Sequence, residues 1–284
     1  MAITREDLQS PLKPTWCPGC GDYGIWLSVK QALIQSGYKH EEVCLVYGIG
    51  CHGHMCNTLR AYGFEGLHGR PIPVAEGIKL ANNRLKVIVV AGDGDTFGEG
   101  LNHFIAGIRG NHDITLIVHD NRVYGLTTGQ ASPTSAKGYK SKSTPQGVIE
   151  VPVNPIALAI AAGGSFVARG FAADPKQLTE LILRGLEHKG FAVIDVMQNC
   201  ISFNHVNTVL WFKEHSYHLE DEGHDPSNKI EALKRALDEE RLGTGIFYQD
   251  SRGAYDAQLA AERVPLVDHD LSSIDISESM EQFT

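Results

Sequence analysis

Residues 89–125 read VVAGDGDTFGEGLNHFIAGIRGNHDITLIVHDNRVYG and decide the fold class. An apolar run ends in Gly-Asp-Gly at residues 92–94, a helical pattern follows, and a second apolar run ends at Asp120 and Asn121. Continuous apolar runs of this kind are typical of strands that are buried on both faces of a parallel sheet. The order strand, helix, strand therefore predicts one crossover unit of an α/β sheet.

The same alternation extends along most of the chain. Five apolar runs predict strands, at residues 43–48, 86–92, 114–120, 165–170 and 191–197. Helical patterns lie around them, at residues 22–37, 54–63, 74–83, 100–110, 154–163 and 174–190. We therefore expect a doubly wound, mainly parallel α/β sheet in a domain at residues 1–204.

Two further segments have no strand pattern. Residues 127–147 are rich in Ser, Thr, Gly and Lys and predict a long loop, which in a compact domain is usually functional or disordered. Residues 205–284 have few apolar side chains and one amphipathic helical pattern at 228–243. We expect this part to be an irregular C-terminal extension that contacts another subunit.

Charge and hydropathy exclude several classes of partner. The net charge of −9 argues against nucleic acid or an anionic membrane as the main partner, because both select basic surfaces. No apolar run approaches the roughly 18 residues of a membrane-spanning helix, and the first residues lack a signal-peptide core. The sequence thus predicts a cytoplasmic protein, in which cysteines are thiols or metal ligands rather than disulfides.

Asp93 and Asn121 each follow a predicted strand directly. The carboxyl ends of neighbouring parallel strands meet at one edge of the sheet, where such folds bind ligands. Carboxylate and amide oxygens suit Mg²⁺ holding a diphosphate, and the glycines allow backbone N–H groups to approach phosphate oxygens. The alternative is an ordinary Gly-Asp turn followed by an Asx turn, but the occurrence of both features at adjacent strand ends favours a binding site.

The six cysteines divide by position. Cys44 lies inside a predicted strand and Cys56 in a helical pattern, so both are expected to be packed thiols. The other four can reach the edge that carries the Asp and the Asn: Cys17, Cys20, Cys51 and Cys200. Four thiolates can hold Zn²⁺ or a [4Fe–4S] cluster, and spacing alone does not separate the two.

At this point a family resemblance is clear. The Gly-Asp-Gly followed by a distant Asn resembles the thiamine-diphosphate motif. Together with CPGCGDYG, GIGCHGHM, GLHGRPIPVAEGIKLAN, NRVYGLTTGQASPTS and a late Cys, it resembles the β subunit of 2-oxoacid:ferredoxin oxidoreductases over most of residues 14–204. A low-potential cluster beside thiamine is a natural electron acceptor, which favours iron–sulfur over zinc.

The resemblance implies roles for particular residues. It implies that Mg²⁺ is held by Asp93, Asn121 and Val123, and a [4Fe–4S] cluster by Cys17, Cys20, Cys51 and Cys200. It implies that thiamine diphosphate is bordered by Ile49, Gly50, Cys51, His52, His68, Gly94, Asp95, Gly125 and Leu126. Where relatives often have Asn-Asn, this chain has Asp120–Asn121, and the expected ligand position is intact.

The implied activity is the oxidative decarboxylation of 2-oxoglutarate with CoA to succinyl-CoA and CO₂, with electrons passing through the cluster to ferredoxin, or the reverse carboxylation. GIGCHGH followed by GLHGRPIP is most similar to the 2-oxoglutarate members. His52 or His54 could meet the second carboxylate of that substrate, with Leu126 beside the reacting centre. Alternatively, these histidines only pack or cap the following helix.

This chain has room for only the diphosphate-binding half of a thiamine enzyme. The resemblance therefore implies an α subunit that carries the pyrimidine-binding half, in an αβ or (αβ)₂ assembly. Three alternatives stay open: a pyruvate-type or broad 2-oxoacid enzyme of the same family, a non-redox thiamine-dependent decarboxylase with structural zinc, and a non-enzymatic metal-binding or electron-transfer module.

Overall fold

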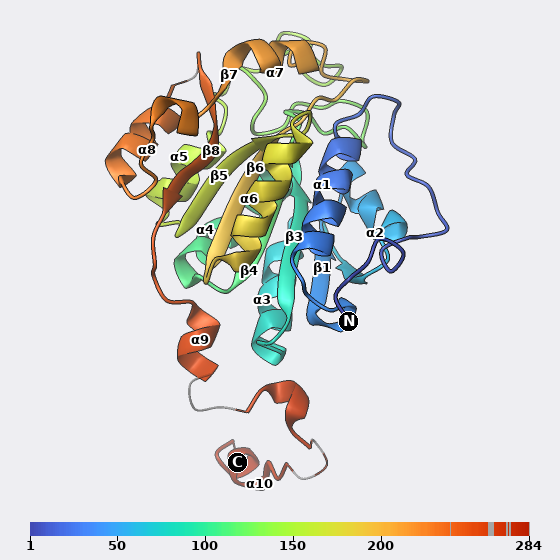
Figure 1. Cartoon of the computed structure of the whole chain (residues 1–284), viewed down its shortest axis with the longest axis vertical. Coiled ribbons are helices and arrows are strands. Elements are labelled where there is room, and N and C mark those ends of the chain that lie inside the picture. Colours follow the sequence, from blue (N-terminus) through green and yellow to red (C-terminus); the bar gives the residue numbers. More distant parts are fainter. Residues whose placement is uncertain (239, 261–263, 271, 273, 284) are drawn as a thin grey trace.

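Eight strands form one sheet in the computed structural model, which describes residues 1–238, 240–260, 264–270, 272 and 274–283 (Figure 1). Their order across the sheet is β2-β1-β3-β4-β6-β5-β8-β7. The five predicted strands are confirmed as β1 (Val43–Tyr47), β3 (Lys86–Gly92), β4 (Ile114–Asp120), β5 (Phe166–Phe171) and β6 (Phe191–Met197). All five are parallel and fully buried, which explains their nearly continuous apolar sequences.

Helices cover both faces of the sheet. α1 (Asp22–Gln35) and α6 (Pro175–Glu187) pack on one face, and α3 (Pro71–Ala81), α4 (Leu101–Gly110) and α5 (Pro155–Ala161) pack on the other. α1 approaches the sheet closely at Gly24, where a Cβ atom would lie 2.0 Å from the carbonyl oxygen of Ala172. Glycine is required there, and this contact holds the preceding CPGC segment at the carboxyl edge of the sheet.

One helix prediction is wrong in part. The pattern at residues 54–63 yields only the short helix α2 (Met55–Thr58), and the chain then forms the edge strand β2 (Tyr62–Glu65), which pairs with β1 in parallel. The side chains of this strand are exposed, so it lacks the apolar run by which the buried strands were recognised.

The C-terminal extension enlarges the sheet, which the sequence analysis did not predict. β8 (Leu242–Gln249) runs antiparallel to β5, and β7 (Ser216–His218) adds to its outer edge. The pattern at 228–243 gives the helix α8 (Lys229–Ala236), which packs against α5 and β8. Glu239 of that pattern lies outside the described residues. β8 contains two glycines, at positions 243 and 245. Because glycine is unfavourable within strands, residue propensity does not identify this segment as a strand.

The two ends of the sheet are covered differently. Figure 1 shows the long segment between β4 and α5, together with α7 (Val209–His215), at the end where β3 and β4 finish, and α9 (Tyr255–Ala260) and α10 (Ser277–Glu281) beyond the opposite end. Among the described residues, no helix has the length and hydropathy needed to cross a membrane.

Candidate functional site

The four cysteines predicted as metal ligands line one cavity of about 210 Å³, here called the thiol cavity. Cys17 and Cys20 come from the turn before α1, Cys51 from the turn after β1, and Cys200 from the turn after β6. A Cβ atom at Gly125 would lie 3.5 Å from Cys51 Sγ and 3.7 Å from Cys200 Sγ, so both sulfur atoms face the same glycine.

The surroundings of the sulfur atoms combine burial with hydrogen-bond donors. Burial raises the pKa of the Cys51 thiol to about 12 and raises that of Cys200 as well. Backbone N–H groups of residues 202–204 act in the opposite direction at Cys200, because they bond to its sulfur. Ser202 Oγ donates to Cys17 Sγ at 3.0 Å and Gln198 Nε2 to Cys20 Sγ at 3.6 Å. Burial thus disfavours the thiolate forms of Cys51 and Cys200, while hydrogen-bond donors to negatively charged sulfur are in place at Cys17, Cys20 and Cys200.

The other two cysteines lie apart from this cavity. Cys44 is buried in β1, as predicted for a packed thiol. Cys56 is only half-buried, and its thiol donates to Glu65 Oε2 at 3.1 Å. Within the part of the chain that the structure describes, no three His, Cys, Asp or Glu side chains meet as a candidate site for a single metal ion.

A second cavity, of about 60 Å³, lies at the ends of β3 and β4 and is here called the aspartate cavity. The residues predicted to border thiamine and Mg²⁺ all line it: Ile49, Gly50, Cys51, His52, His68, Asp93, Gly94, Asp95, Asn121, Val123, Gly125 and Leu126. They come from the turns after β1, β3 and β4 and from the segment before α3, which parallel strands bring to one edge.

Asp93 lies in a cluster of buried hydroxyl and carboxyl groups. Ser132 Oγ and Thr134 Oγ1 both lie 2.6 Å from Asp93 Oδ2, and Thr134 Oγ1 also lies 2.8 Å from Asp120 Oδ1. A hydroxyl carries one proton, so Thr134 donates to only one of the two carboxylates at a time. Burial and the charge of Asp120 raise the pKa of Asp93 to about 7. A divalent cation would relieve this repulsion, so the donor set fits Mg²⁺.

The turn after β4 is held in an uncommon conformation. Arg122 has a φ of 59°, in the left-handed region that few residues other than glycine adopt. Its guanidinium lies 5.5 Å from the ring centre of Trp211, and Asn204 Nδ2 donates to the carbonyl of Asn121 at 3.1 Å. The N–H of Val123 in turn donates to Asn121 Oδ1 at 3.1 Å. Asn204, which directly precedes the C-terminal extension, and Trp211 within it thus hold the turn that presents Asn121.

Asp95 joins three segments of the aspartate cavity. Its Oδ1 atom accepts backbone N–H bonds from Gly69 at 2.8 Å and from Ile49 at 3.3 Å. The same atom lies 2.6 Å from His68 Nδ1, and this hydrogen bond raises the pKa of His68. Asp95 therefore orders the loops around the cavity as well as lining it.

The two predicted histidines have different surroundings. His52 is buried against Gly50 and Gly92, where a Cβ atom would lie 2.6 Å and 2.8 Å from its Cε1 atom. Burial lowers the pKa of His52 to about 4, so it is neutral near pH 7. His54 is only partly buried and lines the thiol cavity, with Nδ1 3.4 Å from Thr15 Oγ1. His52 lines the aspartate cavity, whereas His54 lines the thiol cavity.

The two cavities share a wall. Cys51, Asn121, Gly125 and Leu126 line both of them. A group held by the four thiols would therefore lie next to a group held by Asp93 and Asn121. This adjacency is what one-electron transfer between two bound cofactors requires.

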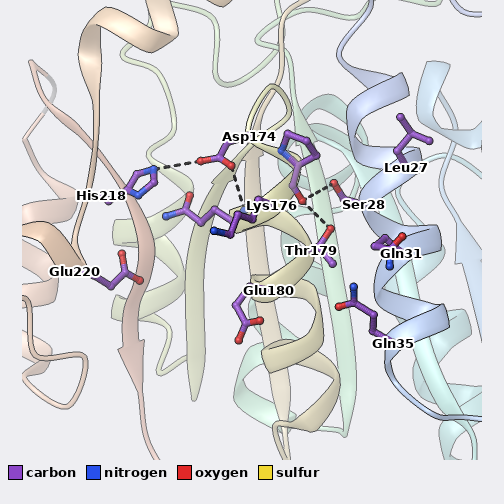
Figure 2. A pocket seen from close by; sticks show the side chains of 12 residues that line it. Leu27, Ser28, Gln31, Gln35, Asp174, Lys176, Thr179, Glu180, His218 and Glu220 are labelled. Carbon is purple, nitrogen blue, oxygen red and sulfur yellow. Dashed lines mark hydrogen bonds and ion pairs between the residues drawn. The ribbon is translucent and has the colours of Figure 1, made fainter.

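A larger cavity, of about 880 Å³, lies elsewhere, between α1, α6 and β7 (Figure 2). Its Asp174 and His218 pair at 3.2 Å, while Ser28 and Thr179 donate to the carbonyl of Pro175. Figure 2 shows that its other labelled side chains are the apolar Leu27 and several amides, carboxylates and an ammonium, which are spread along the groove and do not converge on one point. We interpret it as a groove between helices rather than as a catalytic site.

Several residues at the site were not predicted from the sequence. Ser132 and Thr134 belong to the Ser- and Thr-rich segment 127–147 and to the motif NRVYGLTTGQASPTS, but neither signal singled them out. Asp22 and His119 form a buried pair, with Oδ1 and Nδ1 2.7 Å apart. Burial is the largest single effect and acts to raise the pKa of Asp22, but His119, Cys20 and His52 together outweigh it, and the pKa is lowered.

The hydroxyl groups around Asp93 provide a first test. We predict that Ser132→Ala lowers the affinity for thiamine diphosphate with Mg²⁺ by about 10–100-fold, because hydrogen bonds to a metal-ligating carboxylate fix its orientation. Titration calorimetry measures this affinity. The control is Ser141→Ala in the same loop, whose hydroxyl contacts only loop hydroxyls and the backbone at Thr144. Equal affinities in the two variants would contradict the role of Ser132.

Comparisons with known proteins first define the class. Residues 48–196, a little over half of the chain, match the family described as "Thiamine pyrophosphate enzyme, C-terminal TPP binding domain". Residues 200–263 match the family described as the C-terminal part of the pyruvate ferredoxin oxidoreductase beta chain. The chain is thus a thiamine-diphosphate domain of the kind found in thiamine enzymes.

Individual relatives narrow the class. The chain is 45% identical to a 2-oxoacid:ferredoxin oxidoreductase subunit beta of Sulfolobus sp over 268 residues, 89% of this chain and 88% of the relative. It is 41% identical to the 2-oxoglutarate oxidoreductase subunit KorB of Mycobacterium tuberculosis, over 70% of this chain and 53% of that one. The chain also resembles the solved structure of a 2-oxoglutarate:ferredoxin oxidoreductase from Magnetococcus marinus with 2-oxoglutarate, coenzyme A and succinyl-CoA bound. The two chains are 34% identical and superpose with a TM-score of 0.90, and the match covers 99% of this chain and 96% of that chain.

The chain belongs to the β subunits of the 2-oxoacid:ferredoxin oxidoreductases. It is accordingly part of an oxidoreductase, and its membership as a β subunit implies an α subunit as partner. The resemblance recognised in the sequence and the expected α/β fold are both confirmed.

Proposed function

We propose that this chain, with its α subunit, catalyses the oxidative decarboxylation of 2-oxoglutarate with CoA to succinyl-CoA and CO₂, or the reverse carboxylation. The cofactors of the reaction are thiamine diphosphate, Mg²⁺ and a [4Fe–4S] cluster, and ferredoxin is the electron acceptor. The observation that carries the proposal is the wall shared by the thiol cavity and the aspartate cavity. When bound, thiamine diphosphate would supply the electron sink and the cluster one-electron transfer.

The donor set supports Mg²⁺ in the aspartate cavity. Asp93 and Asp120 are both buried, and hydroxyl groups of Ser132 and Thr134 contact their carboxylates. Asp93, Asn121 and Val123 would hold the ion, while the backbone around Gly94 would face the diphosphate. Asp95 keeps the loops after β1 and before α3 in place around it.

The thiol cavity supports a cluster. Its volume of about 210 Å³ is many times the roughly 10–15 Å³ that one water molecule needs, so it has room for a multi-atom group. Cys17, Cys20, Cys51 and Cys200 would bind it, and the donors from Ser202 and Gln198 suit thiolate sulfur. Membership of an oxidoreductase family rules out the non-redox decarboxylase, so structural zinc at the same four thiols is the competing proposal for the metal.

The preference for 2-oxoglutarate is supported by relatives and by His54. KorB proteins of Mycobacterium tuberculosis and Archaeoglobus fulgidus are named for 2-oxoglutarate, whereas the Sulfolobus relative is named for 2-oxoacids in general. His54 lines the thiol cavity close to Leu126, which also lines the aspartate cavity. A pyruvate-type or broad 2-oxoacid enzyme is the second candidate, because the general name covers both.

A substitution separates the two specificities. We predict that His54→Leu lowers kcat/KM for 2-oxoglutarate by about tenfold and leaves that for pyruvate nearly unchanged, since a hydrogen bond to a charged group contributes ~1.5 kcal/mol or more. Steady-state kinetics of the αβ enzyme with both substrates measures this ratio. His103→Leu on α4 is the control. A ratio unchanged by His54→Leu would make His54 a packing residue.

The whole proposal is tested on protein that is co-expressed with its α subunit and purified without oxygen. Iron, sulfide and zinc are quantified, and an EPR spectrum is recorded after adding 2-oxoglutarate and CoA. About four irons per β chain and a substrate-reduced cluster signal are expected. Zinc without iron would support a structural metal and contradict the electron-transfer part of the proposal.

A further inference from the structure

Asp22 is a buried carboxylate that contacts a predicted cluster ligand. Its side chain is 1% exposed, and its Oδ2 atom lies 3.2 Å from Cys20 Sγ. Its other oxygen lies 2.7 Å from His119 Nδ1, so the carboxylate bridges the sulfur and the imidazole. It also lines the thiol cavity. None of the roles proposed above for substrate, Mg²⁺ or thiamine uses this group.

A carboxylate beside a ligand sulfur has an electrical consequence. Cys20 donates its proton to Asp22 when it is a thiol, but as a cluster ligand it would be a thiolate and would face a second negative group. The cluster site faces negative charge from Asp22 whether or not His119 is protonated. Asp22 touches the sulfur and His119 lies behind it, so the negative end of the pair faces the cavity in either case.

Neighbouring groups act on the cluster site in the opposite sense. Ser202 donates to Cys17 and Gln198 donates to Cys20, and hydrogen bonds to sulfur stabilise the more negative, reduced cluster. A fixed negative charge stabilises the oxidised cluster instead. Burial leaves little water to screen Asp22, so its influence on the cavity is strong.

We propose that Asp22, held by His119, is a positioning residue that lowers the reduction potential of the cluster. Its effect opposes that of the hydrogen bonds from Ser202 and Gln198, which raise the potential. A lower potential favours passage of electrons from the cluster to a low-potential acceptor and, in the carboxylating direction, makes the cluster a stronger reductant. The inference rests on the proposed function, because it requires that the four thiols hold a [4Fe–4S] cluster.

The test is an EPR-monitored redox titration of the αβ enzyme, with iron and sulfide measured on the same samples. Asp22→Asn keeps the shape of the side chain, removes the charge and offers an N–H to the sulfur. We expect full iron content and a midpoint potential that is higher by at least about 59 mV. For a one-electron couple this shift corresponds to a tenfold change in the reduction equilibrium constant. Ser202→Ala removes a donor and should shift the potential downward.

Asp22→Glu retains the charge and should keep the potential close to that of the wild type. An unchanged potential in Asp22→Asn, with iron retained, would overturn the inference. So would loss of iron from both Asp22 variants, since Asp22 would then be needed for assembly of the cluster rather than for its potential. Absence of iron from the wild-type enzyme would instead contradict the proposed cluster itself, so the two failures are distinguishable.

Discussion

Asp93→Asn should abolish magnesium-dependent binding of thiamine diphosphate while leaving the apoprotein folded. Asn keeps the shape of the side chain but removes the charge that a hard cation requires. We expect the affinity to fall by more than about 100-fold, since loss of a hydrogen bond to a ligand already costs 10–100-fold. Titration calorimetry with thiamine diphosphate and MgCl₂ on the αβ enzyme measures this loss.

The same variant makes a separate prediction for stability. Burial and Asp120 raise the pKa of Asp93 to about 7, so the folded apoprotein binds a proton there between pH 3.8 and 7 that the unfolded chain releases. The contribution of Asp93 to the free energy of unfolding therefore falls as pH rises through this window. Asp93→Asn removes this pH dependence. Without Mg²⁺, the thermal unfolding midpoint of the variant should therefore rise relative to that of the wild type as the pH increases to 7.

Asp174→Asn is the matched control. Asp174 caps the first turn of α6, where its Oδ1 accepts the N–H of Gln177 at 3.1 Å, and Asn caps helices equally well. Its affinity for the cofactor should equal that of the wild type. Tight magnesium-dependent binding by Asp93→Asn would remove Asp93 from the site and, with it, the proposed role of the aspartate cavity.

Cys200→Ser should lose most of the roughly four irons per chain expected of the loaded enzyme, because a hydroxyl is a poor ligand for iron in a cluster. Cys200 comes from the turn after β6, and its sulfur faces Gly125 together with that of Cys51. Iron and sulfide analysis of anaerobically purified αβ enzyme measures the loss.

Cys44→Ser provides the comparison. Cys44 lies within β1, and its neighbours on either side are Tyr62 and Val87 in the adjacent strands. A buried hydroxyl costs stability of about 1–3 kcal/mol there, but iron content should be unchanged. Equal iron loss in the two variants would show that the division of the cysteines by position is wrong.

The main sheet and the residues at its edge could be predicted because their signals are local. Each buried strand is a short apolar run, and Asp93 and Asn121 follow two of these runs directly. Strands that are parallel and adjacent finish at the same edge, so the order of elements along the chain already brings both side chains together. Cys51 and Cys200, in the turns after β1 and β6, follow the same rule.

The outer strands were missed for the converse reason. β2 is exposed and β8 contains two glycines, so neither has a continuous apolar pattern. β8 is a strand because β5 has a free edge with which it can pair, over 70 residues earlier in the chain. Pairing of this kind is decided by the partner strand rather than by the propensity of the segment itself.

By itself, the sequence determined the parallel α/β core, the edge that carries Asp93 and Asn121, and the separation of four candidate ligand cysteines from Cys44, because each depends on residues within one strand or helix and the turn next to it. Only the tertiary structure showed that Ser132 and Thr134 contact Asp93 and that Asp22 pairs with His119. These contacts join segments about 40 to 100 residues apart, and hydrogen bonds between distant side chains impose no periodic pattern on the sequence.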